Sequence, residues 1–438
     1  MTMKLRNVPF SPPDMTEVEA TEVRDAILSG WITTGPRVKK LEKMIADYVG
    51  VDNASDNQKT PNVVCLNSAT AAMEMVLHLL GVGPGDEVIV PAYTYTASAS
   101  VITHVGATIK MVDIQKGNFE MDYDLLADAI TEKTKVVVPV DLAGIVCDYD
   151  RIFEIVESKK SLFRPANELQ KKIGRVVVGA DCAHAFGSER HGKKTGAIAD
   201  FSSYSFHAVK NFTTAEGGAI CWNLPFGKEK VGVSTAEWTM NGYEGIPLIE
   251  GENWNEYLYR LSQLFSLHGQ NKDALAKTKL GAWEYDIIAP WYKCNMTDIM
   301  GALGLVQFER YPEMLAKRRN YIELYNEGFK DLNVAPLNHY GVDWAGSGHL
   351  YIVRLLGKTR EVANTVIEKM AERGIACNVH YKPLPMMTAY KRLGFDIKNY
   401  PNAFAFFENE ITLPLNTRMT EEDVEYVIEN FADIVKNL

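Results

Sequence analysis

Short apolar runs alternate with segments of helical periodicity between about residues 60 and 220. The apolar runs predict strands at residues 63–66, 87–90, 108–112, 136–140, 175–179, 201–206 and 219–222. Intervening segments such as 71–80 and 123–130 carry apolar residues on one face and predict helices. Alternation of this kind predicts a mostly parallel sheet that helices cover on both faces. The expected fold class is therefore α/β.

Two helices are predicted before the first strand. Residues 1–14 are rich in proline and predict an extended arm. A helix at 16–29 would begin at Thr16 as N-cap, and its rough apolar stripe consists of Val18, Val23, Ile27 and Leu28. A loop with two glycines and a proline follows, and then a second amphipathic helix whose apolar face holds Val38, Leu41, Ile45 and Tyr48.

The remainder of the chain divides into less regular segments. A helix at 152–158 continues into the charged segment 159–172, which predicts an exposed excursion. The pattern breaks down at 223–290, which predicts an irregular excursion with short helices. Beyond it the sequence predicts a long helix at 297–332, strands at 351–355 and 375–379, and helices at 360–373 and 420–437.

These patterns predict two domains. The large one covers residues 1–300, with an N-terminal arm at about 1–30 and the excursion at 223–290. The small α+β domain covers residues 301–438, and the boundary falls inside the long helix.

Composition narrows the function classes. The chain has 438 residues with 46% hydrophobic and 23% charged, as in ordinary globular proteins. A net charge of −10 argues against nucleic acid as the main partner. The six cysteines are scattered without C-x-x-C spacing, so neither a metal site nor disulfides are expected, and they suggest buried thiols in a cytoplasmic protein. No run is long enough for a membrane helix.

One lysine stands out among the candidate functional residues. Lys210 lies on the short connection between the strands predicted at 201–206 and 219–222, among hydroxyl and amide side chains. Open α/β sheets place ligands near strand ends. Lys210 is therefore either a surface residue on a hairpin or a lysine that forms a Schiff base with a carbonyl cofactor.

Three further positions carry candidate chemistry. The turn at 67–70 joins a strand to a helix, so it is either an anion site or a plain helix cap. Asp181 ends an apolar strand, where an unpaired carboxylate is costly and where functional sites occur. Tyr93 and Tyr95 follow another strand and serve either packing or cofactor contact.

Taken together, and in their order along the chain, these features resemble those of fold-type I enzymes that depend on pyridoxal phosphate (PLP). The resemblance is specifically to the DegT/DnrJ/EryC1/StrS family of sugar aminotransferases. The resemblance covers nearly the whole chain. Its motifs are GWITTGPRV at 30–38, NSATAAM at 67–73, PAYTY at 91–95, DCAHAFG at 181–187, SFHAVKN at 205–211 with AEGG at 215–218, YKCNMTD at 292–298, HYKPL at 380–384 and LPLN at 413–416.

The resemblance implies a role for each matching residue. Lys210 would hold PLP covalently and act as the base for proton transfer, and Asp181 would pair with the pyridinium nitrogen. Tyr95 would stack on the ring, and His184 would lie beside the ring oxygen. The phosphate would be bound by Ser68, Ala69, Thr70 and Ser205.

Other contacts are implied for the partner subunit and the substrate. Asn295, with Lys293 as a competitor, would reach the phosphate from the second subunit of a homodimer with shared active sites. The loops with Gly30 and Trp31 and with His380 and Tyr381 would face the substrate. The implied reaction moves an amino group, from glutamate in most relatives, to C4 of a keto-sugar linked to a nucleotide.

The sequence departs from the family pattern in places. Pro385 stands where many relatives have a histidine, and the segments 158–173 and 224–290 look longer than usual. Because substrate contacts come largely from such loops, the sequence leaves the identity of the sugar and of the nucleotide open. Alternatives are an aminotransferase for a keto-cyclitol, a sugar dehydratase, and a non-catalytic regulatory relative. The presence of Lys210 argues against the dehydratase, and Lys210 together with Asp181 argues against the non-catalytic relative. A NAD-dependent dehydrogenase is a further alternative, but this sequence shows no strand–GxGxxG–helix motif that would support it.

Overall fold

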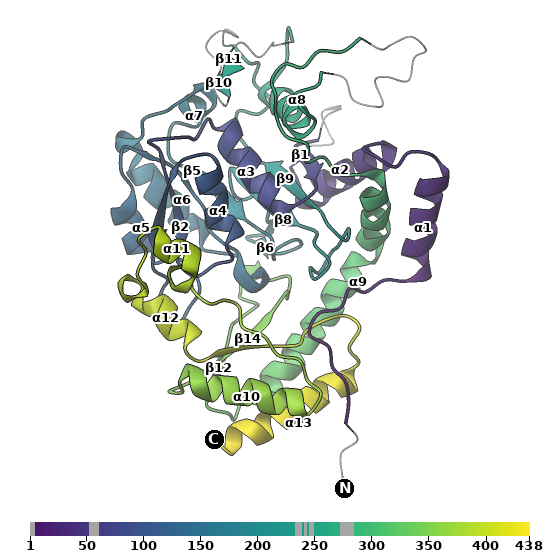
Figure 1. The fold of residues 1–438 in the computed structure, drawn as a ribbon, viewed down its shortest axis with the longest axis vertical. Helices are drawn as coiled ribbons and strands as arrows, with labels where there is room; N and C mark the ends of the chain where they lie inside the picture. Colours follow the sequence, from purple (N-terminus) through teal and green to yellow (C-terminus); the bar gives the residue numbers. More distant parts are fainter. Residues whose placement is uncertain (1–4, 52–60, 233–238, 241–242, 245–248, 272–283) are drawn as a thin grey trace.

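The computed structural model describes residues 5–51, 61–232, 239–240, 243–244, 249–271 and 284–438 (Figure 1). A large sheet with its helices forms the upper part of the view. A smaller sheet lies below, where the described start of the N-terminal arm and the C-terminal end also lie. The long helix α9 (Asp298–Phe329) runs from one part to the other.

The large sheet has the strand order β1-β9-β8-β5-β4-β2-β3. Among these strands only β9 runs antiparallel to its neighbours, so the prediction of a mostly parallel α/β sheet is confirmed. Its strands are short and almost fully buried, as expected for a sheet with both faces covered. The strands are β1 (Val63–Leu66), β2 (Glu87–Pro91), β3 (Thr108–Val112), β4 (Thr134–Val137), β5 (Val177–Asp181), β8 (Phe201–Ser205) and β9 (Gly218–Trp222).

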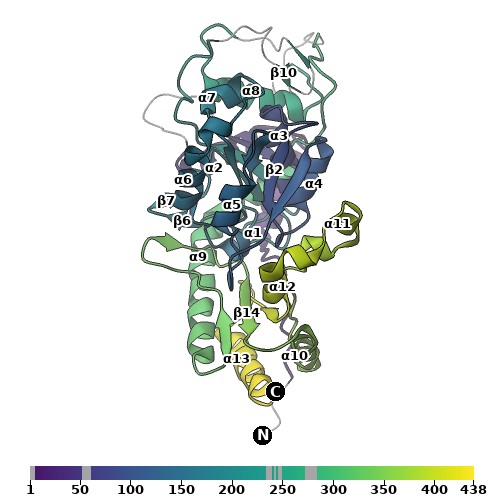
Figure 2. The ribbon, with the colours of Figure 1, turned by 90° about the vertical axis from the view of Figure 1, so that its left-hand side faces the viewer.

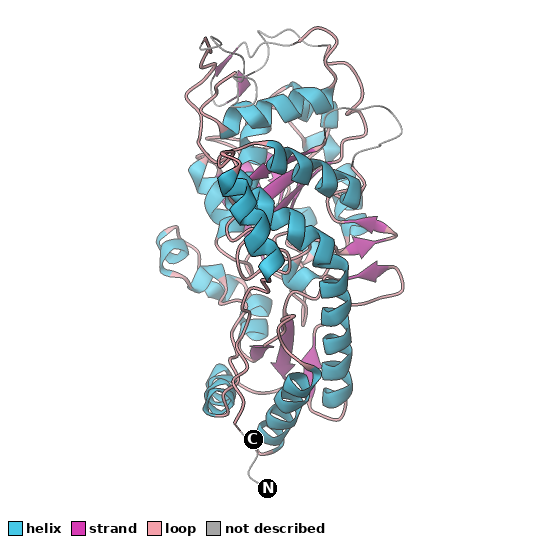
Figure 3. Ribbon diagram, turned by 90° about the vertical axis from the view of Figure 1, so that its right-hand side faces the viewer, coloured by secondary structure: helices cyan, strands magenta, loops and turns pink. Residues whose placement is uncertain are grey.

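Helices lie on both sides of this sheet (Figure 3). Polar residues fix where several of them begin, because an N-cap oxygen accepts a hydrogen bond from a free backbone N–H. Ser68 caps the helix that follows β1, and Asp122 caps the helix that follows β3. The helices of this part are α2 (Pro36–Val49), α3 (Ala69–Leu79), α4 (Ala97–His104), α5 (Tyr123–Ala129), α6 (Tyr149–Ser158), α7 (Glu168–Ile173) and α8 (Trp254–Ser266).

The smaller sheet has the order β12-β14-β15 and is antiparallel. Its strands are β12 (Val334–Pro336), β14 (Tyr351–Leu355) and β15 (Glu410–Leu413). Helices α10 (Arg360–Glu372) and α13 (Glu421–Lys436) pack beside it with the second half of α9. A third sheet joins β13 (Trp344–Ala345) to the hairpin of β6 (Glu189–Arg190) and β7 (Lys193–Lys194).

Buried apolar side chains form two clusters. The α9 residues up to Met314 belong to the large cluster, and those from Tyr321 onward belong to the small one. The division near residue 300 stays a prediction. However, α11 (Thr388–Arg392) and α12 (Pro401–Phe407) return to the large part, and their Tyr390 and Phe406 join the large cluster (Figure 2).

The predicted strand at 375–379 is wrong. Ile375 pairs only with Val8 of the N-terminal arm, and Asn378 pairs only with Thr412 of β15. Because these partners belong to different segments, each pairing extends over a single residue and no continuous strand forms.

The charged segment 159–172 is also more ordered than an exposed excursion. Asn167 caps the short helix α7, and its side chain donates to the carbonyl of Leu79. Leu169 and Gln170 are fully buried, and Gln170 donates to the carbonyl of Leu80. The segment therefore closes the C-terminal end of α3.

Of the four apolar residues predicted to form a stripe on the first helix, Val23 is half-buried and the other three are exposed. Helix α1 (Glu17–Leu28) begins at Thr16 as predicted, with a capping box to Glu19. Its Glu19 is buried against α9, where it accepts from Gln307 at 2.7 Å. Val18, Ile27 and Leu28 are therefore left 58%, 52% and 71% exposed.

The predicted irregular segment at 223–290 lies partly outside the described residues. The described part contains the short strands β10 (Thr239–Met240) and β11 (Tyr243–Glu244). It also contains α8, which packs on α3 and β1 through buried residues such as Trp254 and Leu258.

The cysteines are unpaired, and all but the half-buried Cys377 are buried, close to the expectation of buried thiols. Among the helices that the structure describes, none is both long and apolar enough to cross a membrane.

Candidate active site

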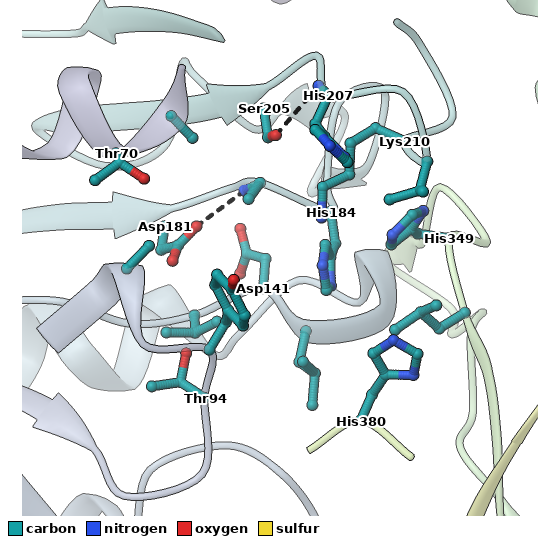
Figure 4. A pocket seen from close by; sticks show the side chains of 18 of the residues that line it. Thr70, Thr94, Asp141, Asp181, His184, Ser205, His207, Lys210, His349 and His380 are labelled. Atoms are coloured by element: carbon teal, nitrogen blue, oxygen red, sulfur yellow. Dashed lines mark hydrogen bonds between the residues drawn. The ribbon is translucent and has the colours of Figure 1, made fainter. Parts of the chain in front are cut away.

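A cavity of about 370 Å³ opens at the carboxyl ends of the parallel strands (Figure 4). The segments that follow β1, β2, β4, β5 and β8 all contribute to its wall. This edge is where open α/β sheets bind ligands, because loops and helix N-termini converge there. Ten residues predicted from the sequence line it: Ser68, Ala69, Thr70, Tyr95, Asp181, His184, Ser205, Lys210, His380 and Tyr381.

Lys210 lies in the connection between β8 and β9, as predicted. Its backbone N–H donates to the carbonyl of His207 at 2.9 Å, which closes a turn. The connection is held further on by Thr213 and Thr214, whose hydroxyls donate to the carbonyls of Phe206 and Glu216. Burial lowers the pKa of Lys210 to about 8, although the charge of Asp181 acts in the opposite direction. A Lys210 amine can therefore exchange protons near neutral pH.

The turn before α3 forms the other end of the cavity. Ser68 caps the helix by accepting from the backbone N–H of Ala71 at 3.1 Å, and Thr70 lines the cavity beside it. Gly218 at the start of β9 lies directly against this turn, since a Cβ there would be 2.4 Å from the backbone nitrogen of Ala69. The lysine hairpin and the helix N-terminus are thus held at close contact.

Asp181 is the last residue of β5 and is 5% exposed. Its Oδ2 accepts from the hydroxyl of Ser98 at 2.7 Å, and its Oδ1 accepts from the backbone N–H of Ala183 at 3.1 Å. Burial raises the pKa of Asp181, while these two hydrogen bonds and Lys210 lower it. The carboxyl group is therefore fixed in orientation, and a positively charged partner would stabilise its ionised form.

Imidazole rings form the side of the cavity near Lys210. His184 Nδ1 accepts from the backbone N–H of Ala143 at 3.2 Å, so its proton is on Nε2, which lies 3.3 Å from the hydroxyl of Tyr381. The ring centre of His349 is 4.3 Å from that of His184. Burial and the charge of Lys210 lower the pKa of both rings, so both are neutral.

The N-terminal arm closes the outer side. Phe10 stacks on the ring of His380 at 5.5 Å, and the hydroxyl of Ser11 donates to the carbonyl of Val209, next to the lysine. Asn416 donates to the carbonyls of Pro9 and Phe10. The arm was predicted to be extended, but its place in the cavity wall was not predicted.

Three predicted residues lie outside the cavity of this chain. Asn295 pairs across from Leu66 at the end of β1 and donates to Thr34 at 2.5 Å. Gly30 and Trp31 lie in the loop after α1. Their predicted roles in the shared site of a dimer, or toward the substrate, stay predictions.

Comparison with known proteins decides the family. The profile of the DegT/DnrJ/EryC1/StrS aminotransferase family matches residues 13–432. The chain belongs to this family.

Relatives at two levels of similarity agree with this assignment. Spr1654 of Streptococcus pneumoniae, a candidate sugar aminotransferase, has been solved in its pyridoxamine phosphate (PMP) form. That structure is 55% identical to this chain, and the match has a TM-score of 0.87 and covers 98% of this chain and 100% of that one. Its PLP form gives 53% identity and the same TM-score over 99% of each chain. The Bacillus subtilis spore coat polysaccharide biosynthesis protein SpsC is 31% identical over 98% of this chain and 97% of its own.

More distant structures share the fold. PseC of Helicobacter pylori, an aminotransferase of pseudoaminic acid biosynthesis, is 24% identical with a TM-score of 0.78, over 98% of this chain and 99% of that one. The family match and the PLP form of Spr1654 show that the protein is a PLP-dependent aminotransferase, and the distant structures show the fold-type I architecture.

The cavity of this aminotransferase fits PLP. The N-terminus of α3 with the hydroxyls of Ser68, Thr70 and Ser205 is suited to a phosphate group. The close approach of Gly218 to Ala69 leaves no room for a side chain there, so backbone borders the anion site. Lys210 supplies an amine, and the buried carboxyl group of Asp181 matches a protonated ring nitrogen.

Asp141 and His349 also line the cavity and were missed by the sequence analysis. Asp141 is fully buried and accepts from the Cys147 N–H at 2.9 Å and the Tyr149 hydroxyl at 3.1 Å, and burial raises its pKa to about 7. It directly follows the strand predicted at 136–140, which is the signal that singled out Asp181. His349 shows no local signal, because only tertiary structure brings it to Asn211, 2.9 Å away.

Proposed function

We propose that this aminotransferase transfers an amino group from glutamate to a keto-sugar linked to a nucleotide, with C4 as the aminated carbon. The observation that carries the sugar assignment is the character of the cavity wall. Among the described residues that line it, Lys210 is the only lysine or arginine. Besides the carboxyl groups of Asp141, Asp181 and Glu216, the wall presents several hydroxyl groups and three neutral imidazoles, which suit an uncharged substrate portion rich in hydroxyls. Spr1654 and SpsC, named for sugar and polysaccharide chemistry, support the same class.

The chain's own residues account for the steps around the bound cofactor. PLP supplies a ring that takes up the electrons released when a proton leaves the substrate carbon. Asp181 keeps a proton on the ring nitrogen, because its buried carboxylate favours a cation beside it. Lys210 moves the proton from the substrate carbon through Nζ, which a pKa near neutrality permits. Tyr95, 58% exposed at the cavity, offers a ring face to the cofactor.

The proposal includes a homodimer with shared active sites. The adjacent exposed apolar residues Ile27 and Leu28 at the C-terminal end of α1 provide a patch that a second subunit would cover. Asn295, or its hydrogen-bonded neighbour Lys293, would then reach the phosphate of the other subunit.

A half-reaction tests the substrate class. Excess glutamate first converts the enzyme to the form in which the cofactor is pyridoxamine phosphate, and the glutamate is then removed. The 4-keto nucleotide sugars, the 3-keto nucleotide sugars and the keto-inositols are added in separate experiments. We expect the visible band of the lysine-bound cofactor to return with a 4-keto nucleotide sugar. Return with keto-inositols alone would establish the cyclitol alternative. No response to glutamate would overturn the donor assignment.

A further inference from the structure

Strand β15 carries a buried carboxyl group that the proposed reaction does not use. Glu410 and Thr412 are two residues apart in this strand, so their side chains lie on the same face, and both are fully buried. The hydroxyl of Thr412 lies 3.5 Å from Oε2 of Glu410. Oε1 makes no hydrogen bond of normal geometry within the described residues, although the backbone N–H of His380 lies close enough to lower the pKa of this carboxyl group.

The same hydroxyl also contacts the cavity wall. Thr412 Oγ1 lies 3.0 Å from Nδ1 of His380. A hydroxyl group has one proton. When Thr412 donates it to Glu410, its oxygen accepts from His380, so the imidazole proton lies on Nδ1. The ring of His380 points from its loop toward Lys210, His184 and His349 (Figure 4), and its Nε2 is left as an acceptor.

The surrounding charges are compatible with this arrangement. Burial and the charge of Lys210 lower the pKa of His380 to about 3, so its ring is neutral. Burial raises the pKa of Glu410 to about 8, while Arg360 lowers it, and Tyr93 and Tyr381 lie near the same carboxyl group. In either protonation state, Oε2 of Glu410 can accept from Thr412.

We propose that Thr412 and Glu410 are positioning residues that hold His380 with its proton on Nδ1, so that Nε2 accepts a hydrogen bond from a hydroxyl group of the keto substrate. This inference rests on the proposed function for the identity of the substrate. It assigns opposite roles to two rings of one wall: Nδ1 of His184 accepts from the backbone N–H of Ala143, whereas Nδ1 of His380 would donate to Thr412, 3.0 Å away. Such a wall contacts a polyol through both a donor and an acceptor.

The tautomer is measured directly by NMR of the enzyme labelled with ¹⁵N-histidine, in which protonated and unprotonated ring nitrogens differ in chemical shift. His380→Asn identifies the His380 signals. We expect Nδ1 to be protonated in the wild type and in Thr412→Ser. In Thr412→Val, which removes the hydroxyl at nearly equal volume, we expect this preference to be lost. An unchanged tautomer in Thr412→Val, or a proton on Nε2 in the wild type, overturns the inference.

Kinetics then test the link to the substrate. In Thr412→Val, and in Glu410→Met, which removes both acceptor oxygens, we expect KM for the keto substrate to rise about tenfold, because one hydrogen bond to a hydroxyl group is weakened. We expect the glutamate half-reaction and the visible cofactor band to be unchanged, and Thr412→Ser to restore KM. An equal loss in both half-reactions would indicate a merely structural role and would overturn the positioning role.

The two proposals fail in different ways. If no keto-sugar restores the cofactor band in the wild type, the proposed function is wrong. The NMR result does not depend on that outcome, since it reads the ring of His380 in the resting holoenzyme.

Discussion

Gly218 and Ala69 lie so close that a Cβ on Gly218 would be 2.4 Å from the backbone nitrogen of Ala69. This contact joins the strand after the lysine connection to the N-terminus of α3. We expect Gly218→Ala to separate them, lowering the free energy of unfolding by roughly 1–3 kcal/mol and weakening PLP binding. Thermal unfolding and PLP titration measure both effects. Gly83→Ala is the control, because its new Cβ would meet only one carbonyl oxygen, at 3.8 Å; an equal effect of both variants would contradict the explanation.

Lys210 is expected to be indispensable for catalysis. Lys210→Ala should remove the visible band of the lysine-bound cofactor and lower turnover by at least about a thousandfold, because both the covalent attachment and the proton transfer are lost. Circular dichroism should show the fold intact. Lys382→Ala, which changes an exposed lysine near the cavity, serves as the matched control. Near wild-type turnover of Lys210→Ala would disprove the assignment.

The attachment of PLP to the apoenzyme should depend on pH through Lys210. Only the neutral amine reacts, so the rate of attachment should rise with pH and level off above about 8. The carboxylate of Asp181 stabilises the charged amine and so raises its pKa. In Asp181→Asn this effect is lost, the pKa falls, and the rise should occur at lower pH. Stopped-flow absorbance measures the profile, and a shift to higher pH would contradict the sign of this interaction.

Ser98 should influence the pH at which activity is lost on the acid side of the pH–rate profile. Its hydroxyl donates to Asp181 at 2.7 Å and lowers the pKa of that carboxyl group. In Ser98→Ala the pKa of Asp181 should rise, so the acid limb of the pH–rate profile moves to higher pH. We expect a loss of rate of about three- to tenfold at low pH. Ser100→Ala, in the same helix but without a contact to Asp181, is the control; identical profiles for the two variants would rule out the coupling.

The exposed side of α1 should hold the dimer together. Leu28, 71% exposed, lies there beside Ile27, 52% exposed. A charge in a buried apolar interface is unfavourable, so Leu28→Glu should shift the protein toward the 49.0 kDa monomer in light scattering. Leu5→Glu is the control, because Leu5 is similarly exposed but lies on the arm. A stable dimer in Leu28→Glu would place the interface elsewhere.

Local sequence signals predicted the elements whose causes are local. Thr16 begins α1, and β14 has the predicted bounds, because capping and apolar runs act over a few residues. The face of α1 was predicted incorrectly, since the burial of Glu19 depends on Gln307 and Arg310, nearly three hundred residues away. Likewise, the single pairings of Ile375 and Asn378 depend on partners that no local pattern identifies.

The same distinction applies to the site. Lys210, Asp181 and the turn at Ser68 were predicted because each lies at a strand end, where the fold places ligands. Asp141 shows that signal too and could have been found. His349 and Phe10 could not, because the long-range contacts of His349 with Asn211 and of Phe10 with His380 bring them to the cavity.

The anchoring of the N-terminal arm has a consequence for the order of folding during synthesis. Val8 pairs with Ile375, and Phe10 is held by Asn416, so the arm cannot take its place before the chain has been made as far as residue 416. Domains generally fold as they emerge from the ribosome, beginning at the N-terminus. The outer wall of this cavity is therefore completed only when the C-terminal part of the chain has emerged, and truncated chains carry the lysine in an open site.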